Sequence, residues 1–256
     1  STPTARAMFA SLAIWAAAQI LPVVVPLGNP KQIQKPRAPI EQSGPLFASQ
    51  CKDWDDYDKP APPVRIFGNT YYVGTCGISS ILITDAAGDI LIDGGTDKDA
   101  DLIAANIRKL GIRVEDVRYL LNSHEHFDHV GGLAQLQSMT GAQLVSSPAG
   151  AHALHEGMPT ADDPQAGLKQ SFPTARVDRV VQDGEQVRIG NNVLIALATP
   201  GHTPGALTWH WGSCQGGVCR QIVYADSLTP VSDKTYRFSD HPAYLATYRA
   251  SIAKVA

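Results

Sequence analysis

Four potential metal ligands lie close together in the segment 122–129, which reads NSHEHFDH. His124 and His126 are two residues apart, so in an extended backbone their side chains point to the same side and can share one ion. Asp128 and His129 follow where the chain is expected to turn, and they can face a second ion. Imidazole and carboxylate groups without a thiolate suit zinc, although iron and manganese accept the same ligands. A lone histidine is more often structural than metal-binding, but this grouping predicts a metal site.

A further candidate ligand, His202, lies in the segment 199–205, which reads TPGHTPG. It follows an apolar stretch over 193–198 that predicts a strand. Because proline restricts the backbone, the loop is a rigid support for a ligand distant in sequence. The two segments together predict one metal centre.

The segment 122–129 is flanked by elements that can hold it in place. Residues 117–121 predict a buried strand before it, and residues 133–139 predict a short helix after it, ended by Gly141. Other strands are predicted over 65–73, 78–84, 89–92, 144–146, 177–181, 186–189, 193–198, 207–211 and 221–224. These patterns indicate a mixed α and β domain.

A longer helix is predicted over residues 97–110. Ile103 and Ile107 lie on one face of it, Thr96 can cap its start, and Gly111 can end it. One face of this helix would be buried.

Composition favours one catalytic domain, since the 256 residues are 44% hydrophobic and 18% charged. A net charge of −3 gives no electrostatic reason to expect a nucleic-acid partner. The four cysteines are compatible with two disulfides in an oxidising compartment. The alternative, a structural zinc site at the Cys-x4-Cys pair, lacks a second pair with suitable spacing.

The N-terminal region carries a candidate export signal. The stretch from Met8 to Val25 is almost purely apolar, and Gln19 and Pro22 interrupt it. We interpret residues 1–27 as a signal peptide; the alternative, a membrane anchor, usually needs about 20 uninterrupted apolar residues. Residues 28–63 are expected to form an irregular lead-in and residues 64–256 the domain.

The His-x-His-x-Asp-His segment, followed by a Gly-His-Thr-Pro-Gly loop, resembles the metallo-β-lactamase superfamily. The segments 72–77, 93–95 and 224–229 are similar to the third subclass of zinc β-lactamases. The resemblance implies an α/β fold, a four-layer αβ/βα sandwich over 64–256 that is incomplete at its C-terminal end. It also implies that the first zinc ion binds His124, His126 and His202, and the second Asp128 and His129.

Roles for other residues follow from the same resemblance. Ser227 stands where other subclasses have a cysteine ligand, and with Thr229 it would bind the substrate carboxylate; the alternative is a turn or helix cap. Asp93 would orient the site, or else serve only as a turn residue. The implied disulfides are Cys51–Cys76 and Cys214–Cys219.

The implied function is zinc-dependent hydrolysis of the β-lactam amide bond of penicillins, cephalosporins and carbapenems. A metal-bound hydroxide oriented by Asp128 would attack the small-molecule substrate. We expect a periplasmic or secreted monomer without stable membrane association after processing. The alternatives are another hydrolase of the superfamily, such as a glyoxalase-type thioesterase, or a chain that binds zinc without turnover.

The C-terminal residues depart from this pattern. Family members take a third ligand of the second zinc ion from a later histidine. Residues 242–255 have helical spacing without a glycine after them, and the first residue is Ser1. We therefore expect a truncated chain with weak occupancy of the second zinc site.

Overall fold

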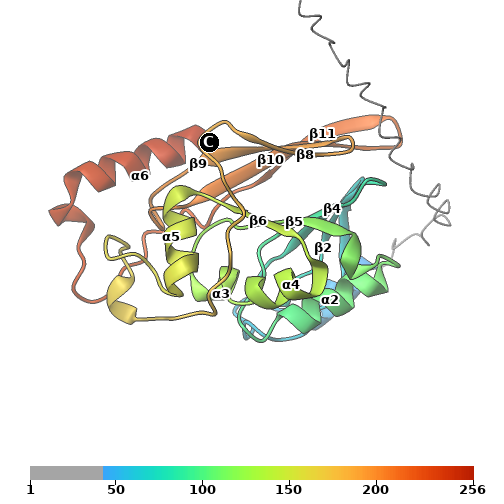
Figure 1. Cartoon of the computed structure of the whole chain (residues 1–256), viewed down its shortest axis with the longest axis horizontal. Helices are drawn as coiled ribbons and strands as arrows, with labels where there is room; N and C mark the ends of the chain where they lie inside the picture. The colour runs from blue at the N-terminus through green and yellow to red at the C-terminus, as the bar shows by residue number, and fades with distance from the viewer. Residues whose placement is uncertain (1–42) are drawn as a thin grey trace, which may run out of the picture. The chain divides into compact units, whose positions relative to one another are not determined.

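The computed structural model describes residues 43–256, so the predicted signal peptide lies outside the described residues (Figure 1). The first sheet has the order β1-β2-β3-β4-β5-β6-β7, antiparallel from β1 to β4 and parallel from β4 to β7. Its strands are β1 Val64–Phe67, β2 Thr70–Tyr72, β3 Ile81–Ile83, β4 Asp89–Ile92, β5 Val117–Leu121, β6 Gln143–Ser146 and β7 Arg179–Val180.

The second sheet is antiparallel, in the order β11-β10-β9-β8. Its strands are β8 Gln186–Ile189, β9 Asn192–Ala198, β10 Leu207–Gln215 and β11 Val218–Tyr224. The α-helices are α1 Ser43–Gln50, α2 Ala100–Lys109, α3 Phe127–Val130, α4 Leu133–Thr140, α5 Pro148–Glu156 and α6 Pro242–Val255, and the 3-10 helices are η1 Val114–Asp116, η2 Ala166–Leu168 and η3 Phe238–Asp240.

Two apolar cores lie on the two faces of the first sheet. Because successive strand residues point to opposite faces, Leu91 of β4 packs with Ile103 of α2, whereas Ile92 packs with Trp209 of the second sheet. Burial of both faces is typical of parallel strands, and all four residues of β4 are buried. In Figure 1, α2 and α4 lie on one side of the first sheet and the second sheet lies on the other.

The predicted helix over 97–110 is present, but its start differs from the expectation. The helix begins at Ala100, and Asp99 is its N-cap residue. The prediction that Thr96 caps the helix was wrong: the backbone N–H of Thr96 instead donates to Asp99 Oδ2 at 2.8 Å. Gly111 follows the last turn with a φ of 73°, the left-handed conformation that favours glycine at a helix end.

The expectation of an irregular lead-in over 28–63 was wrong for residues 43–50, which form α1. No apolar periodicity signals this helix. Tertiary contacts hold the region instead: the ring of Phe47 packs edge-on against Tyr72, with centroids 5.1 Å apart, and Cys51 is bonded to Cys76. The second expected disulfide, between Cys214 and Cys219, is also present and closes the β10–β11 hairpin.

Strand direction determines where the chemistry lies. β4 and β5 are parallel, so Asp93 and the segment 122–129 leave the sheet at the same edge. The loop between β9 and β10 reaches this edge from the second sheet, because Leu207 N–H donates to the carbonyl of Ser123 at 2.6 Å. Among residues 43–256, no helix has both the length and the apolar character needed to cross a membrane.

Candidate metal centre

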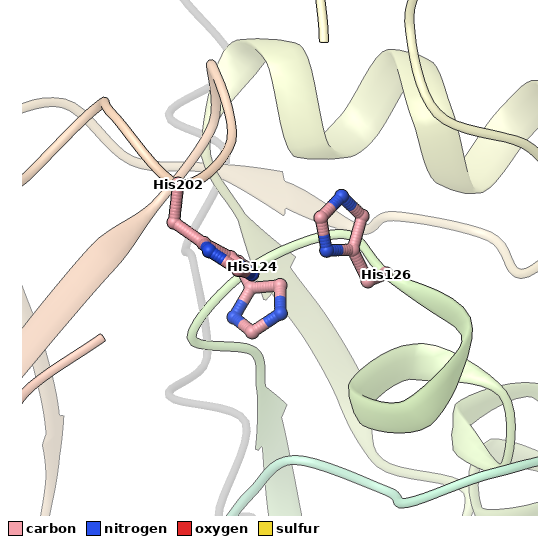
Figure 2. Close-up of side chains that lie close together, drawn as sticks. All are labelled: His124, His126 and His202. Carbon is pink, nitrogen blue, oxygen red and sulfur yellow. The ribbon is translucent and has the colours of Figure 1, made fainter. Parts of the chain in front are cut away.

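His124, His126 and His202 come together at the edge shared by the two sheets. Their ring centroids are 4.7–5.0 Å apart, and all three residues are buried. One ring nitrogen from each lies within 4.8 Å of the others. Figure 2 shows the three rings converging from the 122–129 segment and from the loop after β9.

Each of these rings has one nitrogen next to an oxygen atom of the protein. The contacts are His124 Nδ1 to Asp226 Oδ1 at 2.8 Å, His126 Nε2 to Asp163 Oδ2 at 3.0 Å, and His202 Nδ1 to the carbonyl oxygen of Thr229 at 2.8 Å. An imidazole that donates from one nitrogen offers a lone pair on the other. The nitrogens left to bind a metal are therefore Nε2 of His124, Nδ1 of His126 and Nε2 of His202.

The protonation state of the rings suits metal binding. Burial and the three neighbouring histidines hold the pKa of His124 well below its ordinary value. Burial also lowers the pKa of His202, against the opposing hydrogen bond to Thr229. Both rings are thus neutral near pH 7. Imidazole donors without a thiolate form a donor set that fits zinc.

A second group consists of Asp128, His129 and His124, which also offer ligand atoms within 4.8 Å of one another. His129 Nε2 lies 3.8 Å from Asp128 Oδ2, and its Nδ1 lies 2.7 Å from Asp93 Oδ2. Burial alone would lower the pKa of His129, but the charge and hydrogen bond of Asp93 raise it to about 9. Asp128 and His129 therefore lie beside the histidine triad, where a second ion could bind.

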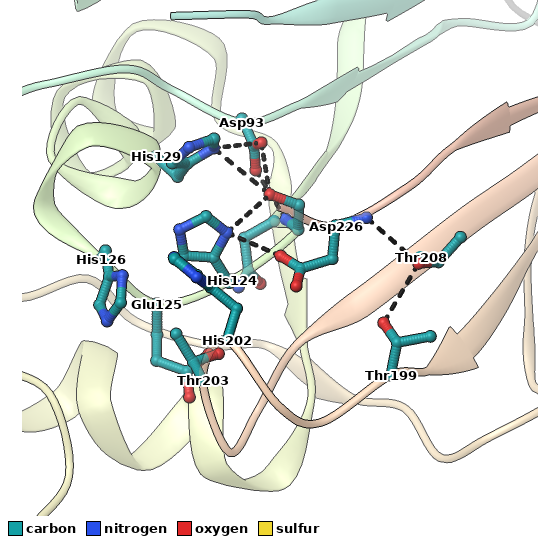
Figure 3. A network of polar contacts seen from close by, with 12 residues as sticks. Asp93, His124, Glu125, His126, His129, Thr199, His202, Thr203, Thr208 and Asp226 are labelled. Atoms are coloured by element: carbon teal, nitrogen blue, oxygen red, sulfur yellow. Dashed lines mark hydrogen bonds and ion pairs between the residues drawn. The ribbon is translucent and has the colours of Figure 1, made fainter. Parts of the chain in front are cut away.

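Asp93 is a fully buried acceptor at the end of β4. Besides His129, it accepts hydrogen bonds from the backbone N–H of Ser123 at 2.6 Å, the Ser123 hydroxyl at 2.7 Å and the Tyr224 hydroxyl at 2.9 Å. Its φ of 65° is left-handed, a conformation that Asp adopts more readily than most residues. Asp93 thus contacts His129 within a buried polar network (Figure 3), and its role in orienting a metal site stays a prediction.

The sequence pattern did not indicate a role for Glu125. This residue is fully buried, and it accepts hydrogen bonds from the Thr203 hydroxyl at 2.8 Å and the Gly205 N–H at 2.7 Å. Burial raises the pKa of Glu125 to about 7. Glu125 thus joins the segment that carries His124 to the loop that carries His202.

Two other aspartates were also missed. Asp163 and Asp226 are almost fully buried, and they contact His126 and His124. Burial raises the pKa of Asp226 to about 7. A contact between residues this distant in sequence leaves no local pattern, although Asp226 lies in the segment 224–229 that carried the family resemblance.

Ser227 and Thr229 lie in the loop after β11, and both are exposed. The carbonyl of Thr229 accepts from His202, whereas its hydroxyl is 3.4 Å from the same nitrogen. The Thr229 side chain thus lies beside the histidine triad, and contact of Ser227 and Thr229 with a substrate carboxylate stays a prediction.

Comparison with known proteins identifies the family. The profile of the metallo-beta-lactamase superfamily matches residues 73–250. The chain belongs to this superfamily. Among solved structures, the MIM-2 metallo-beta-lactamase is 54% identical with a TM-score of 0.81, and the match covers 84% of this chain and 79% of that one. The fold is therefore the metallo-β-lactamase fold.

Curated relatives are more distant members of the superfamily. A probable metallo-hydrolase of Burkholderia pseudomallei is 30% identical over 53% of this chain and 48% of its own length. A hydroxyacylglutathione hydrolase of Rhodospirillum rubrum is 25% identical over 43% of this chain and 35% of its own length. The chain thus spans about half or less of the length of these curated relatives.

Proposed function

We propose that this protein is a zinc-dependent β-lactamase of the third subclass, which hydrolyses penicillins, cephalosporins and carbapenems. The observation that carries the proposal is the buried triad His124, His126 and His202, in which a protein oxygen contacts one nitrogen of each ring, in a chain 54% identical to a metallo-β-lactamase. Asp128 and His129 are the proposed ligands of a second zinc ion.

Different residues of the chain have different roles in the proposed hydrolysis. When bound, zinc lowers the pKa of water and polarises a carbonyl group. Asp128 lies beside the triad with 17% of its side chain exposed, so its carboxylate can accept a proton from the attacking water and orient it. The water oxygen forms a bond to the lactam carbonyl carbon, the carbon–nitrogen bond breaks, and the ring nitrogen receives a proton.

We assign substrate binding to exposed residues in the loop after β11. We propose that the hydroxyls of Ser227 and Thr229 donate hydrogen bonds to the carboxylate that β-lactam antibiotics carry. Such donors would hold the lactam ring in a fixed orientation relative to the histidines. A substrate held in its reactive orientation reacts faster. We further propose a periplasmic or secreted location, since the two disulfides are typical of an oxidising compartment.

The direct test is hydrolysis of a carbapenem and a cephalosporin, with added zinc and with a chelator. We expect turnover that the chelator abolishes and zinc restores. Asp128→Ala should remove most turnover while leaving the unfolding transition unchanged, because Asp128 is partly exposed at the site. Near-normal rates in Asp128→Ala would refute the role of this carboxylate.

The alternative is a thioesterase, which the hydroxyacylglutathione hydrolase relatives suggest. The same samples should therefore be offered a glutathione thioester. Chelator-sensitive thioester cleavage without lactam turnover would replace the β-lactamase proposal and retain the zinc site.

A further inference from the structure

Two loops distant in sequence carry the oxygens that hold the outer nitrogens of two zinc-site histidines. The 160–168 loop carries Asp163, which contacts His126, and the 226–236 loop carries Thr229, which contacts His202. If these loops moved independently, the two rings would lose their fixed orientation. A connection between the loops would therefore matter to the metal centre.

Asp233 makes that connection with its backbone and its side chain. Its N–H donates to the carbonyl of Pro164 at 2.9 Å, and its Oδ2 accepts from the N–H of Gly167 at 2.9 Å. A Cβ atom at Gly167 would lie only 2.4 Å from Asp233 Oδ2, so a larger residue there would displace the Asp233 carboxylate. We call this pair of contacts the Asp233 clasp.

The other carboxylate oxygen keeps Asp233 in place. Oδ1 accepts from the Thr235 hydroxyl at 2.7 Å, the Thr235 N–H at 2.7 Å and the Tyr236 N–H at 3.0 Å. These hydrogen bonds, with the one from Gly167, lower the pKa of Asp233 to about 2, so the group is ionised at neutral pH. The carboxylate is therefore an acceptor on both oxygens.

Residues next to the Asp233 clasp are connected to the metal centre. Pro164 is the chain neighbour of Asp163, whose side chain is almost fully buried against His126. In the other loop, Val231 N–H donates to the carbonyl of Thr229, the same oxygen that accepts from His202. The clasp thus connects the supports of two of the three ligands.

We propose that Asp233 is a positioning residue that fixes both loops, so that His126 and His202 are oriented before zinc arrives. The inference rests on the proposed zinc function of the triad. It predicts that loss of the clasp weakens metal binding, whereas an ordinary loop contact of the same kind would affect only stability.

The chain offers a matched control in Asp85. Its Oδ1 accepts from Ala87 N–H at 2.9 Å, and its Oδ2 accepts from Asn191 N–H at 3.1 Å. A Cβ atom at Gly190 would lie 2.0 Å from Asp85 Oδ1, so a larger residue there would displace the Asp85 carboxylate. It joins the β3–β4 and β8–β9 turns, at the opposite end of β4 from Asp93.

The test compares Asp233→Asn with Asp85→Asn. At position 233 the amide must face a backbone N–H on one side, so at least one hydrogen bond is lost. Zinc affinity is measured by chelator competition, and the ring N–H of His126 is followed by NMR in the metal-free protein. For Asp233→Asn we expect about tenfold weaker zinc binding, which is the lower end of the loss in metal affinity when a residue that supports a metal ligand is replaced. We also expect faster hydrogen exchange of the His126 ring N–H. Asp85→Asn should change neither quantity.

A second variant, Gly167→Ala, separates the clasp from the charge of Asp233. It keeps the carboxylate but displaces it from the Gly167 N–H, and it should reproduce the weaker zinc binding. The inference is overturned if Asp233→Asn binds zinc within about twofold of the wild type, or if Asp85→Asn weakens zinc binding equally. A wild-type protein that binds no zinc would instead refute the proposed function, and the His126 N–H would still report on the clasp.

Discussion

Replacement of Glu125 by alanine should destabilise the metal-free protein and separate the two ligand-bearing segments. The substitution leaves the Thr203 hydroxyl and the Gly205 N–H without their shared acceptor in a buried environment. Each buried group that loses its partner costs about 1–3 kcal/mol, which gives about 2–6 kcal/mol for the pair. Burial of the carboxyl is itself unfavourable, as its raised pKa indicates. We therefore expect a loss near the lower limit, about 2–3 kcal/mol.

Glutamine is the matched substitution for this experiment. Glu125→Gln keeps the volume and one carbonyl oxygen for Gly205, and its amide can donate to the Thr203 hydroxyl, which is also an acceptor. The cost should stay under about 1 kcal/mol, in the range of a hydrogen bond exchanged for another.

The assay is denaturant unfolding of both variants without metal, followed by zinc titration. Glu125→Ala should unfold at a lower denaturant concentration. It should also bind zinc more weakly, because the hydrogen bonds that join the segment of His124 to the loop of His202 are lost. The reasoning is refuted if the alanine variant is within about 0.5 kcal/mol of the wild type, the usual range for neutral surface changes, or if glutamine is as harmful as alanine.

Three further outcomes are expected. Gly201→Ala would place a Cβ 2.0 Å from the buried ring of Tyr248 and should cost about 1–3 kcal/mol, whereas Gly212→Ala, with no atom within 4 Å, should be neutral in the same unfolding assay. The hydrogen bond from Lys254 lowers the pKa of Asp183. This contact therefore stabilises the fold above the unfolded pKa of Asp, and the stabilisation is lost as the pH falls through the lowered pKa. Lys254→Met should cost about 0.2–1 kcal/mol at pH 7, and the difference in unfolding midpoint between the variant and the wild type should vanish in acid. Free zinc at about one hundred times its Kd should stabilise the protein by about 2.7 kcal/mol, and a thermal scan in which zinc leaves the midpoint unchanged would contradict binding to the folded state.

The metal ligands could be predicted from the sequence because they are dense and local. His124 and His126 lie in one short segment, and His202 follows an apolar strand in a loop with two prolines and two glycines. Strand β5 and helix α6 have the predicted bounds, since an apolar run and a helical repeat are properties of adjacent residues.

The groups that support these ligands could not be predicted in the same way. Asp163 is 37 positions from His126, and it lies in a stretch without regular periodicity. The oxygen that holds His202 belongs to the backbone of Thr229, and a backbone carbonyl has no residue type to identify it. Helix α1 was missed for a related reason, because contacts from Phe47 and Cys51 stabilise it more than local propensity does.

The most direct test of the account is a crystal structure of the zinc-loaded protein, with anomalous diffraction recorded at the zinc absorption edge. We predict a peak bonded to Nε2 of His124, Nδ1 of His126 and Nε2 of His202, while Asp226, Asp163 and Thr229 keep the opposite nitrogens. A peak elsewhere, or zinc bonded to any of the nitrogens that those oxygens hold, would contradict it.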